Sequence, residues 1–68
     1  MDRLKEFNER LLWGENKGYT SVIAEGEGIA FFVKENNLIV GDVVKNSLGH
    51  DFKVVKILSK SRVIAEEI

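Results

Sequence analysis

Residues 19–34 read YTSVIAEGEGIAFFVK, two apolar runs on either side of a Gly-Glu-Gly sequence. Val, Ile, Thr and aromatic side chains pack well on a pleated sheet, so the runs predict strands at Tyr19–Glu25 and Gly28–Lys34. Gly26 and Glu27 form a two-residue connection, and glycine in its first position suits a type II′ turn. This stretch therefore predicts an antiparallel hairpin.

The β-branched residues are distributed unevenly along the 68-residue chain. There are eight Val, six Ile and one Thr, and all fifteen lie at or after Thr20. The first nineteen residues contain none. Because β-branched side chains lose rotamer freedom in helices, this distribution predicts a helical N-terminal part followed by a β body.

The N-terminal part has the apolar spacing of an amphipathic helix. Apolar residues recur at i, i+3, i+7 and i+8, which are Leu4, Phe7, Leu11 and Leu12. These positions fall on one stripe of a helix. With Asp2 as N-cap and Gly14 as a stop, we predict a helix over residues 2–13.

Three further strands follow the hairpin, at Gly41–Lys45, Asp51–Leu58 and Arg62–Glu67, with a loop at Asn46–His50. Five short strands without long helices between them favour antiparallel pairing. Closure would remove the exposed edges. We therefore predict a single domain over residues 1–68, mostly β, with the helix packed on a five-stranded antiparallel small barrel, OB or SH3-like, over residues 19–67.

The expected core combines the helix stripe with one face of each strand. Its predicted members are Leu4, Phe7, Leu11, Val22, Ile29, Phe31, Val33, Val43, Val54, Ile57 and Ile64. A chain of this size buries only about 60% of its unfolded surface, so self-association would help to stabilise it. Pairing of the N-terminal helix stripe between subunits would give such a homo-oligomer.

The composition argues against several classes of protein. The formal net charge is −1, with no cysteine and one histidine, His50. A nucleophile, base or metal site needs several convergent groups, so we expect no enzyme, no metal and no cofactor. Neither a membrane span nor a secretory leader is predicted from the sequence, and we expect a cytoplasmic protein with no membrane partner.

The charges are unevenly placed. Residues 45–62 contain five basic residues against Asp51 alone, a balance of +4, whereas the first 36 residues have a balance of −2. This predicts a basic face built by the last two strands, which would attract a polyanion. The alternative is that the lysines only keep exposed strand positions soluble.

Phe31 and Phe32 are adjacent in one predicted strand, so their side chains point to opposite faces. If Phe31 faces the core, Phe32 projects outward with Lys34, and an aromatic ring beside a lysine can stack a nucleic-acid base. Alternatively, the N-terminal helix covers Phe32. Trp13 has the same two interpretations, as an anchor of the helix or as a surface platform.

Residues 13–34 resemble the cold-shock domain. The resemblance rests on Trp13, on Lys-Gly-Tyr at 17–19, on Val-Ile at 22–23 and on Phe-Phe-Val-Lys at 31–34. It implies an OB barrel whose aromatic residues stack on single-stranded RNA or DNA. Residues 40–66 instead resemble small SH3-like barrels of the KOW and Tudor type, which bind RNA, ribosomal or transcription machinery, or protein tails.

The first functional hypothesis is a module that binds single-stranded RNA or DNA. Phosphates would be contacted by Lys17, Lys34, Lys53, Lys56 and Arg62, and bases would stack on Tyr19 and Phe32. The alternative is a protein-interaction module, a regulatory adaptor or inhibitor of phage or mobile-element type, that uses a strand edge or the helix surface. The two hypotheses differ in whether the aromatic and basic side chains share one exposed face.

Overall fold

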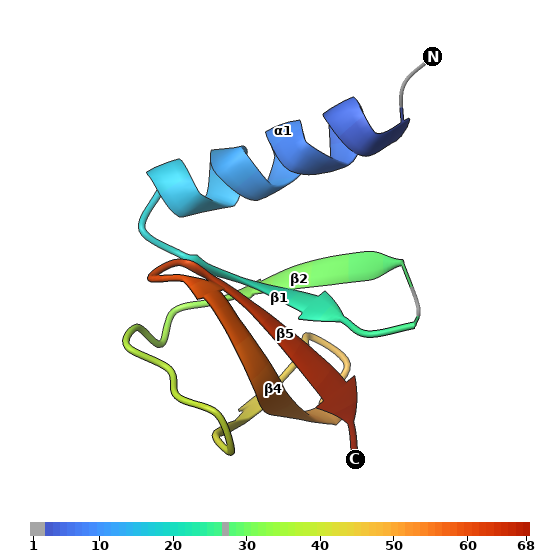
Figure 1. The fold of residues 1–68 in the computed structure, drawn as a ribbon, viewed down its shortest axis with the longest axis vertical. Coiled ribbons are helices and arrows are strands. Elements are labelled where there is room, and N and C mark those ends of the chain that lie inside the picture. Colours follow the sequence, from blue (N-terminus) through green and yellow to red (C-terminus); the bar gives the residue numbers. More distant parts are fainter. Residues whose placement is uncertain (1–2, 27) are drawn as a thin grey trace.

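The structure is a computed structural model that describes residues 3–26 and 28–68 (Figure 1). The described residues form one helix followed by five strands, which confirms the predicted order of a helix and a mostly β body. These elements are α1 (Arg3–Asn16), β1 (Thr20–Ala24), β2 (Ile29–Val33), β3 (Val43–Lys45), β4 (Asp51–Ser59) and β5 (Arg62–Glu67). Asp2 and Glu27, the expected N-cap and turn residue, lie outside the described residues.

The five strands form one curled sheet in the order β2-β1-β5-β4-β3. The predicted purely antiparallel, closed barrel is wrong, because β1 and β5 run parallel and the sheet is an open half-barrel. The Ser21 N–H donates to the Ser61 carbonyl at 2.7 Å, and the Glu25 N–H donates to the Ala65 carbonyl at 2.9 Å. Since the first and last strands pair in the middle, β2 and β3 become the two edges.

Helix α1 is longer than predicted, and Gly14 lies inside it. The end of the helix is formed instead by Gly18, whose φ of +90° is accessible to glycine at little cost. The Tyr19 N–H donates to the Gly14 carbonyl at 3.0 Å, and the Gly18 N–H donates to the Glu15 carbonyl at 3.1 Å. These two bonds are those of a Schellman cap.

One face of the curled sheet, the inner face, holds the core. Its buried members are Val22, Ala24, Val33, Val44, Phe52, Val54, Val63 and Ala65. Phe31 and Leu38 pack against them. The Phe31 and Phe52 rings, from β2 and β4, lie 5.0 Å apart between centroids. The half-barrel is thus bridged by side chains although its edges do not pair.

Four predicted core residues are confirmed as buried: Leu11, Val22, Val33 and Val54. Phe7, Phe31 and Ile64 are only partly buried, and the Leu4 side chain lies outside the described part. The prediction is wrong for Ile29, Val43 and Ile57, which are exposed. It also omits Ala24, Val44, Phe52, Val63 and Ala65.

The core errors have identifiable causes in the strands. In β3 and β5 both members of the pairs Val43-Val44 and Val63-Ile64 are apolar, so alternation does not indicate which member faces inward. In the structure Val44 and Val63 face the core. Ile57 follows a shift of register in β4 and lies outside the core cluster, to which β4 contributes Phe52 and Val54.

Candidate nucleic-acid interface

The candidate site lies on the other face of the sheet, the outer face. Phe32 is opposite Ser21, and Ser21 is opposite Arg62, so β2, β1 and β5 contribute one row of side chains. Helix α1 covers this side of β1 and β2, whereas β4 and β5 extend away from it (Figure 1). The C-terminal half of the helix meets the row.

Gly14 and Phe32 form the tightest contact between helix and sheet. A Cβ built at Gly14 would lie only 2.1 Å from Phe32 Cε1, which is far inside van der Waals contact. The ring therefore takes the space of a side chain at position 14. Phe32 is half-buried, and the helix backbone covers part of its ring.

Three aromatic rings meet at the end of α1. The Phe32 centroid lies 5.9 Å from that of Trp13 and 6.2 Å from that of Tyr19. The Lys17 ammonium lies 5.1 Å from the centre of a Trp13 ring, within the range of a cation–π contact. Trp13 is nevertheless 56% exposed. We call Trp13, Lys17, Tyr19 and Phe32 the aromatic corner.

Two further lysines lie at this end of the molecule. The end of α1, the start of β1, the end of β2 and the turn between β4 and β5 all gather here (Figure 1). Lys34 directly follows β2, and Lys60 lies in the β4–β5 turn beside Ser61, whose carbonyl bonds to β1. The binding residues predicted from the sequence do not include Lys60, because only the parallel pairing of β1 with β5 brings that turn to this end.

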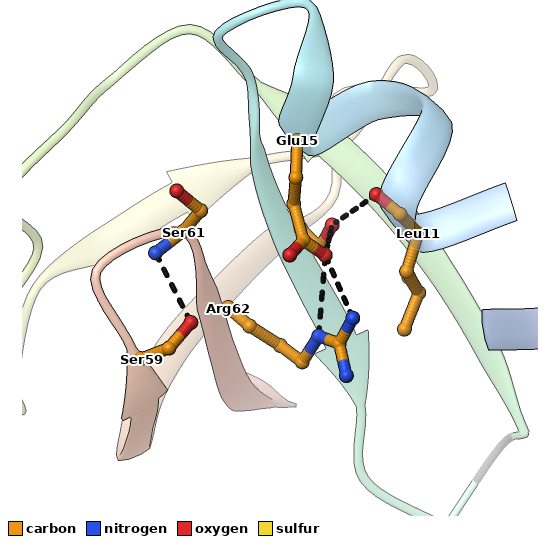
Figure 2. Close-up of polar contacts among 6 residues, drawn as sticks. Leu11, Glu15, Ser59, Ser61 and Arg62 are labelled. Carbon is orange, nitrogen blue, oxygen red and sulfur yellow. Dashed lines mark hydrogen bonds and ion pairs between the residues drawn. The ribbon is translucent and has the colours of Figure 1, made fainter. Parts of the chain in front are cut away.

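Arg62 lies in the same row but is engaged by the helix (Figure 2). Its Nε and Nη2 donate to Glu15 Oε2 at 3.2 and 3.0 Å, and the Ser21 hydroxyl donates to the same oxygen at 3.0 Å. The side chains of Arg62 and Glu15 are only 26% and 15% exposed. Arg62 thus holds α1 on the sheet, and the pair carries no net charge.

The two remaining predicted lysines, Lys53 and Lys56, lie on the outer face of β4. Lys53 is opposite Glu66, and Lys56 is opposite Ile64. Lys53 is six residues from Ser59 along the strand, or roughly 20 Å at the usual rise per residue. The structure therefore separates Lys53 from the aromatic corner and leaves Lys56 between the two ends.

The charge balance of residues 45–62 does not translate into one basic face. Lys45 forms an ion pair with Asp51 at 2.7 Å, Arg62 pairs with Glu15, and Lys53 faces Glu66 across the ladder. Within the described residues, only Lys56 and Lys60 of this basic set have no acidic group as an ion-pair or cross-strand partner. Lys45 is offset by Asp51 within this segment, and Lys53 and Arg62 lie beside acidic residues outside it.

The described residues contain no group of three or more His, Cys, Asp or Glu side chains that could hold a metal ion. His50 Nδ1 lies 3.3 Å from Glu67 Oε2, near the C-terminal end of β5 and away from the aromatic corner. In the same part of the chain, no helix has the length and apolar character needed to cross a membrane.

Comparison of the chain with protein-family models, with curated proteins and with solved structures gave no match. The small curled sheet is compatible with a small barrel. The assignment to an OB or SH3-like type stays a prediction from residues 13–34 and 40–66.

Proposed function

We propose that this protein is a small non-enzymatic module that binds single-stranded nucleic acid at the aromatic corner. The observation that supports this most is a cluster of three aromatic rings in which Trp13 is more than half exposed and has the Lys17 ammonium over its ring. Exposed aromatic rings beside cationic side chains are the usual elements of a sequence-tolerant single-strand site.

The contacts suggest how a single-stranded nucleic acid would bind. A base stacks on the exposed face of Trp13 and displaces the Lys17 ammonium, which then meets a phosphate. This exchange is favourable because base stacking contributes about 1–3 kcal/mol, whereas an exposed cation–π contact contributes about 0.5–1 kcal/mol. Lys34 and Lys60 lie at the same end and would contact flanking phosphates. Phe32, being half-buried, supports the Trp13 and Tyr19 rings.

The fluorescence of Trp13 tests the proposal, because it is the only tryptophan in the chain. Short oligo-dT and oligo-U should quench it saturably at low salt. With three lysines on phosphates, the logarithm of the affinity should fall with the logarithm of salt concentration at a slope of about −2.

A matched pair of variants locates the effect. Lys17→Ala should weaken binding several-fold, whereas Lys53→Ala, an exposed lysine at the other end of the sheet, should not change it. The proposal would be overturned if neither oligo-dT nor oligo-U quenched the fluorescence. It would also be overturned if Lys17→Ala and Lys53→Ala lost affinity equally.

A protein-interaction module is the second candidate, and exposed apolar side chains in the connections favour it. Ile39, Val40 and Leu48 are each at least 60% exposed. Such residues are typical of protein-binding surfaces when they are contiguous. If neither oligo-dT nor oligo-U quenches the fluorescence of Trp13, we expect a protein partner instead. Binding of that partner should be lost in Val40→Lys.

A further inference from the structure

We infer that the free edge of β2 pairs antiparallel with β2 of a second copy of this chain, so that two half-barrels share one continuous sheet. This inference is independent of the proposed nucleic-acid site. Among the strands that the structure describes, β2 is the last on its side of the sheet and has β1 as its only neighbour. Within the described residues, its other edge has no backbone hydrogen-bond partner.

Strand β2 has none of the usual features that protect an edge. Its sequence, IAFFV, contains no charge and no proline, and its register with β1 is continuous, without a bulge. The opposite edge is different: β3 has only three residues, and Lys45 at its end forms an ion pair with Asp51. Short strands and edge lysines oppose edge-to-edge pairing, so β2 is the edge open to a partner strand.

The residues of β2 are complementary to those of a second, antiparallel copy of the same strand. A two-fold axis through Phe31 places Ile29 opposite Val33 of the partner subunit, and Ala30 opposite Phe32 of the partner subunit. Every pair is apolar, and the one bulky outer-face side chain meets the smallest residue of the strand. No like charges meet, and cross-strand apolar pairs of this kind stabilise antiparallel ladders.

Pairing would also cover surface that the single chain leaves open. Ile29 is 54% exposed although its register position is on the core side, opposite Ala24. A second β2 strand would pack Val33 of the partner subunit against Ile29. The inner-face core would then continue across the two-fold axis. A chain of 68 residues has a small core, so burial between copies adds a substantial share.

The two edges offer a matched pair of variants, because Ile29 on β2 and Val43 on β3 are both 54% exposed. Sedimentation of the full chain over a wide concentration range should show a monomer–dimer equilibrium. Ile29→Lys should raise the dimer dissociation constant at least tenfold, and Val43→Lys should leave it unchanged. Circular dichroism checks that both variants are folded.

A second measurement does not depend on any variant. In a mixed sample of ¹³C-labelled and unlabelled chains, isotope-filtered NOEs should connect the methyl groups of Ile29 with those of Val33 of the partner subunit. A monomer at all concentrations would overturn the inference. A dimer that is lost in Val43→Lys or Leu12→Lys but kept in Ile29→Lys would also overturn it, by assigning the interface to β3 or to the helix.

Discussion

The ring of Phe32 occupies the space that a side chain at Gly14 would need, with 2.1 Å between Phe32 Cε1 and a Cβ built on Gly14. This contact explains why α1 contains a glycine two residues before its end. Glycine inside a helix costs about 1 kcal/mol relative to alanine. Here the close approach of helix and sheet offsets that cost, and it places Trp13 beside the Phe32 ring, with Lys17 over Trp13.

Gly14→Ala should therefore destabilise the protein, although alanine is the better helix former. We expect a loss of about 1–3 kcal/mol in the free energy of unfolding, because the ring and the helix must move apart. Urea denaturation measures it. Asn8→Ala, at an exposed position of the same helix, is the control and should be neutral or slightly stabilising. A gain in stability for Gly14→Ala would contradict the contact.

The Glu15–Arg62 pair should behave as a coupled unit. Glu15→Ala and Arg62→Ala should each lower the free energy of unfolding by about 1.5–3 kcal/mol, since each leaves charged hydrogen-bonding groups in a mostly buried position. The double variant should lose less than the sum of the two. Lys45→Ala, in an exposed ion pair, should cost under about 1 kcal/mol. Additive losses at Glu15 and Arg62 would show that the two residues do not interact.

Thr20 connects the start of β1 to the segment that follows β2. Its hydroxyl is buried and donates to the Glu35 carbonyl at 2.8 Å. Thr20→Val keeps the shape and removes the hydrogen bond, so we expect a loss of about 1 kcal/mol in thermal or urea denaturation. Ser47→Ala, at an exposed loop position, is the control and should change stability little. A neutral Thr20→Val would show that this bond does not hold the segment.

Asn37 has a φ of +59°, in the left-handed region that asparagine and glycine tolerate better than other residues. Asn37→Gly should leave stability unchanged or raise it slightly. Asn37→Ala should lower it by about 1 kcal/mol, because the Cβ is strained at this φ without the local polar contacts of asparagine. Thermal denaturation of the two variants side by side gives the comparison, and equal stability would argue against the left-handed conformation.

The local part of the fold could be predicted from the sequence. The start of the β-branched residues at Thr20 marks the boundary between α1 and the strands. Ala24 pairs with Ile29, which is the register that a turn centred on residues 26–27 requires. Hairpin pairing is predictable because turn chemistry and alternation act over a few residues. The same alternation correctly places Val22 and Val33 in the core.

The non-local part could not be predicted. The parallel pairing of β1 with β5 joins Ser21 to Arg62 across forty-one positions, and no local pattern records it. The charges near Arg62 in the sequence predict phosphate binding, whereas in the structure its ion-pair partner is Glu15. The sequence predicts a helix stop at Gly14, whereas in the structure Gly14 lies inside α1 and contacts Phe32, which happens only when the helix packs on the sheet.

The most direct test of the proposed function is an amide-resolved NMR titration with short single-stranded RNA and DNA, at low salt and again at higher salt. We predict shifts at residues 17–19, 32–34 and 60 that weaken as salt rises, with little change around Lys53 and Glu66. No shifts with either strand, or shifts centred on Lys53 and Glu66, would contradict single-strand binding at the aromatic corner.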